Sequence, residues 1–132
     1  MRDLPLIAEW QRVTHRLLAD LDRELADLGL SAGETNALAC FVRQRQRSVR
    51  ELVLATGQRP STLTGVLDRL ERKRLVERVA HPEDRRSLVV RLTADGARTA
   101  DRVSSAFAAV ERQLPAEEMR RALAAFDAQR SG

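Results

Sequence analysis

The sequence has a single cysteine, no tyrosine and few other aromatic residues. With Cys40 alone, no disulfide can form within the chain, as is usual in the reducing cytoplasm. No apolar run approaches the roughly 18 residues needed to cross a membrane, and the first residues lack the long apolar stretch of a secretory signal. We therefore expect one cytoplasmic domain that contacts no membrane, since 132 residues are enough for a hydrophobic core.

Residues that bind metals or catalyse reactions are also scarce. His15 and His81 lie far apart in the sequence, whereas a structural zinc site needs about four cysteine or histidine ligands at short spacings. The six glycines are scattered singly and form no phosphate-binding loop. No serine, histidine and acidic residue are grouped as catalysis would require. We expect neither an enzyme, nor a metal, nor another cofactor.

Positive charge is concentrated in the middle of the chain. Of the 23 basic residues 22 are arginines, and the net charge is −3 over residues 1–42, +7 over 43–91 and zero over 92–132. A local basic block is typical of nucleic-acid-binding proteins, and arginine suits contacts with phosphate and guanine. A biased genome composition with solvated helix faces would give the same charge pattern, so composition alone leaves both readings open.

The few aromatic rings narrow the kind of nucleic acid. Trp10, Phe41, Phe107 and Phe126 lie outside the basic block or at its edge. Proteins that bind single strands or RNA usually stack splayed bases on such rings. Duplex DNA is therefore the favoured partner.

Four helices are predicted in the first half of the chain. Apolar residues recur every three or four positions, and serines three residues before a glutamate have the spacing of a capping box. Gly29 and Gly57 end helices, and Pro60 suits a first helical position. The predicted first helix carries Ile7, Trp10, Leu18, Leu21, Leu25 and Leu28; the second, from Ser31 with Glu34, carries Leu38, Phe41 and Val42; the third, from Ser48 with Glu51, carries Val49, Leu52 and Val53; the fourth carries Leu63, Val66, Leu67 and Leu70.

The periodicity then changes to that of strands. Residues 75–79 and 88–92 are short β-prone runs, and the polar, basic residues 81–86 between them predict a hairpin. Thr93 caps a fifth helix and Pro115 begins a sixth. Their predicted apolar residues are Val103, Phe107, Val110 and Leu114, then Met119, Leu123 and Phe126.

This order of elements predicts a winged helix-turn-helix, mainly α with a small β-hairpin wing and six helices. A helix about 12 Å across fits the major groove, and a hairpin tip can reach the adjacent minor groove. Short hydroxyl side chains near the start of the fourth helix allow close approach to DNA. Arg69 has two readings, because it can contact DNA or pair with Asp68 or Glu71 on its own helix.

Two stretches resemble the multiple-antibiotic-resistance-regulator (MarR) family. Residues 59–78, RPSTLTGVLDRLERKRLVER, are similar to that family's recognition helix and first wing strand. Residues 84–96, DRRSLVVRLTADG, are similar to its wing, an Asp-x-Arg-Ser loop before a strand that ends in Leu-Thr-x-x-Gly. The resemblance implies a homodimeric transcription regulator, usually a repressor, that binds pseudo-palindromic duplex DNA and is released by a small effector or an oxidant.

The resemblance also implies particular site residues. In the family the wing aspartate orients the arginine two residues later, which here are Asp84 and Arg86. Two positions depart from the family pattern, since Arg74 stands where glycine is frequent and Gly65 where a larger polar residue is frequent. The expected DNA-contacting residues are Arg59, Ser61, Thr62, Thr64, Arg69, Asp84, Arg85 and Arg86.

We expect one domain over residues 1–132, with a DNA-binding lobe at 31–93 and dimerisation helices at 1–30 and 94–132. The terminal segments carry more apolar surface than a lobe of about 60 residues can cover, which favours a homodimer. The alternative function is a winged-helix module that uses its basic face to bind acidic protein surfaces.

The expected control is a small, aromatic or anionic effector in a crevice between the dimer helices and the lobe. The candidate contacts on the first helix are Trp10, Thr14 and Arg16. Redox control by Cys40 is the less favoured alternative, because a cysteine among apolar neighbours is usually an inert packing residue with a raised pKa.

Overall fold

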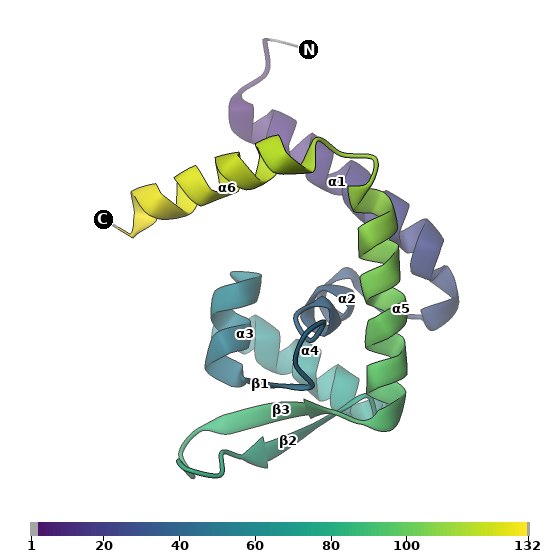
Figure 1. The fold of residues 1–132 in the computed structure, drawn as a ribbon, viewed down its shortest axis with the longest axis vertical. Coiled ribbons are helices and arrows are strands. Elements are labelled where there is room, and N and C mark those ends of the chain that lie inside the picture. The colour runs from purple at the N-terminus through teal and green to yellow at the C-terminus, as the bar shows by residue number, and fades with distance from the viewer. Residues whose placement is uncertain (1–2, 132) are drawn as a thin grey trace.

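A computed structural model describes residues 3–131, which form six α-helices, one short 3-10 turn and three strands (Figure 1). The fold class expected from the sequence, mainly helical with a small β wing, is confirmed. Among the described residues, no helix is both long and apolar enough to cross a membrane. In chain order the elements are α1 (Leu6–Leu25), η1 (Ala26–Leu28), α2 (Ala32–Ala39), β1 (Gln46–Ser48), α3 (Val49–Thr56), α4 (Pro60–Arg72), β2 (Val76–Ala80), β3 (Leu88–Leu92), α5 (Ala94–Glu111) and α6 (Ala116–Arg130).

The helix ends follow the capping signals, with one exception. Ser48 and Glu51 form a complete capping box at α3, and Gly57 ends that helix with φ +69°. At α2 the Ser31 hydroxyl accepts a hydrogen bond from the Glu34 amide, but the Glu34 side chain does not turn back to Ser31. The predicted capping box at α2 is therefore half formed, because the carboxylate is engaged elsewhere in the fold.

The sheet has three strands in the order β1–β3–β2, all antiparallel. Val76 pairs with Leu92 and Ala80 with Leu88, which gives the expected hairpin. The prediction of two strands was incomplete, because the short strand β1 pairs with the other edge of β3. The wing is thus attached to the segment that leads into α3.

One core lies between α2, α4 and α5 and continues onto the wing strands. The leucines and valine predicted to line α4 are all buried, as are Leu38, Phe41, Leu52 and Val103. The placement of Phe41 and Val42 on the second helix was wrong: α2 ends at Ala39, before both of them, and Val42 is 59% exposed.

The wing joins α5 through a tight packed corner. Gly96 lies so close to the Leu75 backbone that a Cβ at this position would stand 1.8 Å from the Leu75 carbonyl oxygen. The Thr93 hydroxyl accepts a hydrogen bond from the Gly96 amide and donates one to the carbonyl oxygen of Arg74. Arg74 itself adopts φ +59°, the left-handed conformation that glycine favours. The chain therefore keeps a glycine-like turn at Arg74 despite the bulkier residue.

The two ends of the chain extend from this body. In Figure 1, α5 runs along one side of the molecule, α1 crosses its upper end, and α6 leads away from it. Arg102 on α5 holds Asp27 through two hydrogen bonds of 3.0 Å, whereas none of the described residues of α6 is buried. The 3-10 turn after α1 is therefore tied to α5, whereas the described residues of α6 add nothing to the core.

Candidate nucleic-acid interface

One face of α4 is polar and open to solvent. Pro60 occupies the first turn, and the buried apolar line fixes which side of the helix faces the core. Ser61, Thr62 and Thr64 are consequently exposed, together with Arg59 at the N-cap position. The Thr64 hydroxyl donates to the Pro60 carbonyl oxygen over 2.9 Å and keeps its lone pairs free to accept. This face presents short polar groups that can approach a nucleic-acid backbone closely.

The wing is fixed to α4 by an arginine that the sequence analysis did not single out. Arg78 on β2 donates from Nη2 to Asp68 and from Nε to Glu71, each over 2.6 Å. Hydrogen bonding to these two carboxylates raises the pKa of Arg78. Because Asp68 and Glu71 both belong to α4, the clamp holds the first wing strand against the helix.

The tip of the wing is ordered by an aspartate. Asp84 accepts hydrogen bonds from the Arg86 amide at 3.0 Å and from the Ser87 hydroxyl at 3.2 Å. It thus holds the main chain of Arg86, and in the described structure neither a hydrogen bond nor an ion pair joins it to the Arg86 guanidinium. Arg85 and Arg86 are exposed, and neither takes part in an ion pair within the described part of the chain.

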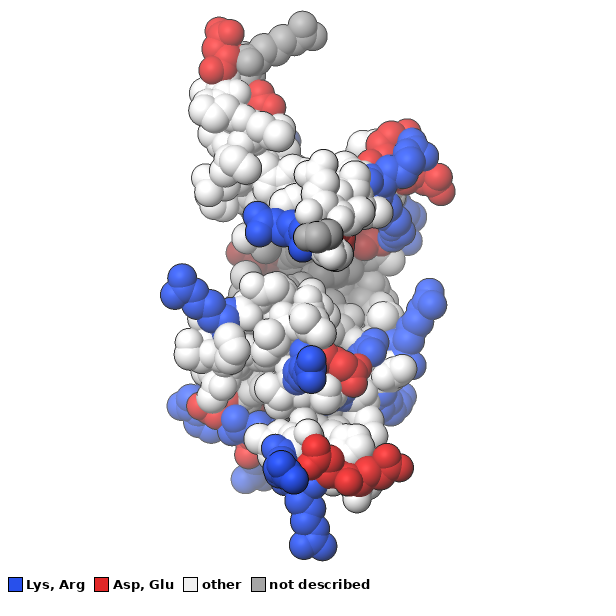
Figure 2. Space-filling model, turned by 90° about the vertical axis from the view of Figure 1, so that its left-hand side faces the viewer, with Lys and Arg blue, Asp and Glu red and all other residues white. Residues whose placement is uncertain are grey.

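Basic side chains project from several places on the part of the molecule that holds α3 and the wing. In Figure 2, lysine and arginine side chains project into solvent from the lower half of the molecule, and acidic side chains lie beside some of them. The positive block predicted from the sequence is therefore displayed at the surface. Ion pairs such as Arg91 with Glu77 and Arg47 with Glu51 offset part of it.

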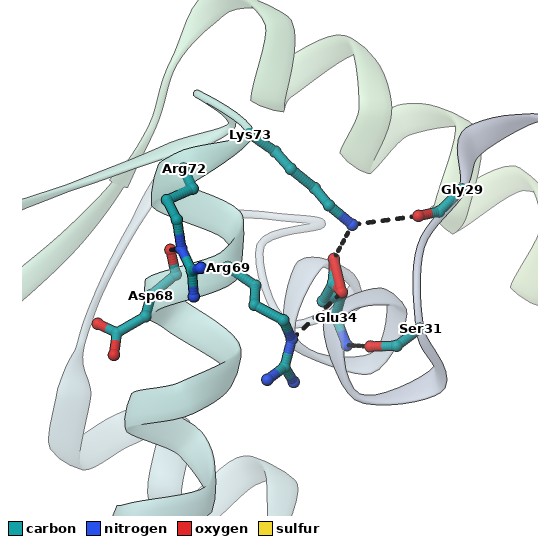
Figure 3. A network of polar contacts seen from close by, with 7 residues as sticks. All are labelled: Gly29, Ser31, Glu34, Asp68, Arg69, Arg72 and Lys73. Atoms are coloured by element: carbon teal, nitrogen blue, oxygen red, sulfur yellow. Dashed lines mark hydrogen bonds and ion pairs between the residues drawn. The ribbon is translucent and has the colours of Figure 1, made fainter.

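Arg69 pairs with a carboxylate that lies far away in the sequence. Its Nε atom is 3.5 Å from Oε1 of Glu34 on α2. The ion pair with Asp68 or Glu71, one of the two predicted readings of Arg69, is therefore not formed. The other oxygen of Glu34 accepts a 2.6 Å hydrogen bond from Lys73 (Figure 3), whose ammonium also donates to the Gly29 carbonyl oxygen. Although burial opposes ionisation, the hydrogen bond from Lys73 lowers the pKa of Glu34, so the carboxylate is charged at neutral pH.

A crevice of about 410 Å³ lies between α1, α2 and α5. Of the three candidate effector contacts, Thr14 lines it, whereas Trp10 and Arg16 do not; Arg16 lies along a shallow groove elsewhere on α1. The walls are mostly apolar, with Phe107 from α5, and Asp22 is the only charged group among the described lining residues.

The crevice reaches the segment that leads into α4. Gln58 lines it, two residues before Pro60, and the Gln58 Oε1 atom is buried without a hydrogen-bond partner in the described structure. Gln58 was not predicted from the sequence, because nothing near it along the chain distinguishes it from an ordinary loop residue.

Cys40 lies at the end of α2. Burial raises the pKa of its thiol, outweighing the nearby charge of Arg47, and the sulfur contacts the Asn36 carbonyl oxygen at 3.4 Å. Among the described residues, no three histidine, cysteine or acidic side chains are close enough together to hold a metal ion.

Comparisons with known proteins agree with this architecture. The family model described as the MarR family matches residues 28–87, from the end of η1 to the residue before β3. No curated protein sequence is significantly similar to the chain.

Solved structures extend the similarity beyond the matched segment. BpsR of Bordetella bronchiseptica, whose DNA binding is regulated by 6-hydroxynicotinic acid, is 25% identical with a TM-score of 0.75, covering 96% of this chain and 93% of its own. CouR of Rhodococcus jostii RHA1, solved with p-coumaroyl-CoA, is 26% identical with a TM-score of 0.76, covering 86% and 85%. A mutant MarR of E. coli in complex with operator DNA shares the fold at 24% identity, with a TM-score of 0.74 over 94% and 92%. The family match shows that the winged-helix segment, residues 28–87, belongs to the MarR family, and the fold of solved regulators such as BpsR and CouR is shared over nearly the whole chain.

Proposed function

We propose that the protein is a repressor that binds pseudo-palindromic duplex DNA as a homodimer, with α4 in the major groove and the wing tip in the minor groove. The observation that carries this proposal is the Arg78 clamp, which joins the hydroxyl-bearing face of α4 and the arginine-bearing wing into one unit. MarR of E. coli, which has this fold, was solved with operator DNA. The DNA-contacting residues are Arg59, Ser61, Thr62, Thr64, Arg69, Asp84, Arg85 and Arg86.

The dimer forms through the two ends of the chain, residues 1–30 and 94–132, and residues 31–93 form the DNA-binding lobe. Leu6 and Ile7 on α1, and Leu123 and Phe126 on α6, are between 46% and 73% exposed in the single chain. Apolar surface of this extent is usually covered by a partner. A two-fold symmetric dimer would cover it and place two copies of α4 one DNA turn apart, about 34–36 Å.

The crevice beside α1 binds the effector in this proposal. Its apolar walls, the absence of a basic side chain among its described lining residues and the free Gln58 oxygen favour a neutral, largely apolar compound with a hydrogen-bond donor over an anion. BpsR and CouR are each associated with a small molecule, which supports this kind of control. Occupation of the crevice would act on α4 through the adjacent Gln58.

The salt dependence of duplex binding tests the function. Neutralising six or more phosphates should weaken binding on the order of a thousandfold between about 50 and 200 mM salt, because counterions are released. Weak binding with a shallow salt dependence would favour the alternative, a module that binds acidic protein surfaces.

Two wing variants test the geometry. Arg86→Ala should weaken DNA binding by about 1–3 kcal/mol per site. Asp84→Ala should also weaken it, because the turn that presents Arg86 loses its hydrogen bonds. Simple charge removal predicts the opposite sign, so tighter binding of Asp84→Ala would contradict a positioning role. The affinities would be compared on one duplex at constant salt.

A further inference from the structure

Gly65 leaves a gap on the exposed side of the DNA-reading helix, and Arg69 covers it. Ser61, Gly65 and Arg69 are spaced by four residues, so they follow one another along the same side of α4. The Nη1 atom of Arg69 lies 3.6 Å from the point where a Cβ would stand at Gly65. The guanidinium therefore bends back toward the start of α4, where the exposed hydroxyls lie.

A buried carboxylate holds Arg69 in this position. Glu34 is 2% exposed, and its Oε1 atom lies 3.5 Å from Arg69 Nε. Its Oε2 atom is taken by Lys73, which is held in turn by the Gly29 carbonyl oxygen. Figure 3 shows Arg69 and Lys73 reaching from α4 to Glu34 on α2. Glu34 is thus fixed before any ligand arrives.

Only one edge of Arg69 is used by this contact. Its side chain is 47% exposed, and within the described residues its sole ion-pair partner is Glu34, on the Nε side. The Nη edge remains available for a second acceptor. A guanidinium that is already held in place loses less side-chain entropy when it binds, which increases the affinity of the contact.

We propose that Glu34 is a positioning residue for DNA binding, which holds Arg69 over Gly65 so that its free Nη edge contacts duplex DNA. The inference rests on the proposed DNA-binding function and deepens it, since it assigns a role to a buried residue on a different helix from the one that reads DNA. Glu34 itself does not touch DNA.

A double-mutant cycle on the full chain tests the inference, with a random-sequence duplex of about 30 base pairs, long enough for two half-sites. Arg69→Met should weaken binding on the order of tenfold, and Glu34→Gln on the order of threefold, since the orienting partner supplies part of the contact. In the Arg69→Met background, Glu34→Gln should leave the affinity for the duplex unchanged. Arg72→Met is the matched control, because Arg72 donates to the main-chain carbonyl oxygen of Asp68 on its own helix and not to Glu34. The effect of Glu34→Gln should persist in full in that background.

Two results would overturn the inference. An equal effect of Glu34→Gln with and without Arg69 would mean that Glu34 only supports the fold, and tighter binding would mean that it withholds Arg69 from DNA. If Glu34→Gln does not fold, Glu34→Leu with Lys73→Met removes the buried carboxylate and its ammonium partner together, and the same cycle applies. A wild-type protein that binds no duplex would overturn both this inference and the proposed function, whereas wild-type binding without coupling would overturn the inference alone.

Discussion

The DNA-binding lobe buries the apolar residues of its helices, whereas the ends of the chain leave many of theirs exposed. The leucines of α4, Leu63, Leu67 and Leu70, are at most 1% exposed. On α1 and α6, Leu6 is 73% and Phe126 is 53% exposed. The two regions have similarly regular helices, so the difference lies in what packs against them.

This contrast shows which apolar surfaces a single chain covers by itself and which it leaves uncovered. The lobe packs with α5 around one core and pairs its buried charge, as Glu34 shows with Lys73. The start of α1 and the whole of α6 have no such cover within the described chain, and α6 buries none of its described residues. The lobe together with α5 is therefore expected to fold as a unit, and the start of α1 and α6 are expected to be surfaces that need a second copy.

The largest expected effect is at the corner between the lobe and α5. Gly96→Ala places a Cβ against the Leu75 carbonyl oxygen, so the backbone must move. We expect a loss of about 3 kcal/mol or more in the free energy of unfolding, measured by urea denaturation. Gly65→Ala is the matched control: its Cβ meets only Arg69 at ordinary contact distance, and it should gain about 0.5–1 kcal/mol. Similar stabilities for the two variants would contradict the packed corner.

A charge placed on the exposed end should separate the dimer. Phe126→Glu should weaken self-association by about 2 kcal/mol or more, since it puts a carboxylate into the apolar contact. Leu54→Glu changes a residue of the lobe that is even more exposed, 76%, and should leave the dimer intact. Sedimentation equilibrium measures both. Dissociation by Leu54→Glu alone would mean that the lobe, and not the ends, forms the interface.

The buried carboxylate should make the stability of the lobe depend on pH. The pKa of Glu34 is lowered in the fold, so its contribution is fully present above its unfolded value near 4.5 and is lost as the pH falls through the lower folded value. Glu34→Gln should cost about 2 kcal/mol at pH 7 and progressively less below pH 4.5. Glu24→Gln, an exposed change on α1, should stay within about 0.5 kcal/mol of the wild type. Thermal unfolding of the wild type and Glu34→Gln at a series of pH values measures this difference. A difference in the free energy of unfolding that stays constant with pH would contradict a stabilising role of the ion pairs.

The smallest expected effect concerns the turn into the wing. Arg74→Gly relieves the left-handed conformation at φ +59° and should stabilise the fold by about 0.5 kcal/mol, because part of the gain is lost to the freer unfolded chain. Arg72→Gly, two residues earlier in the helix, should instead cost about 1 kcal/mol. Chemical denaturation would show opposite signs for the pair. A loss from Arg74→Gly would mean that the arginine side chain stabilises this turn.

Local signals in the sequence predicted the elements that local contacts determine. Ser48 and Glu51 are three residues apart and complete their cap with each other, so the start of α3 followed from spacing alone. The strand β1 did not, because Gln46–Ser48 has no apolar alternation and exists only through its pairing with β3. A strand that forms only because it pairs with another strand shows no hydrophobic periodicity in its own sequence.

The same limit applied to the candidate site. The hydroxyls and arginines of α4 and the wing were visible from composition and order, but the partner of Arg69 was not, since Glu34 lies on another helix. The Ser31–Glu34 spacing predicted a cap, and tertiary attraction to Lys73 redirected the carboxylate. Long-range pairing of charges is the part of the site that only the folded structure reveals.

The most direct test of the account is the selection of bound sites from a random pool of duplex DNA. A symmetric dimer with two copies of α4 on DNA should enrich an inverted repeat whose half-site centres lie about 10–10.5 base pairs apart. Enrichment of a single half-site, or no enrichment at all, would contradict it.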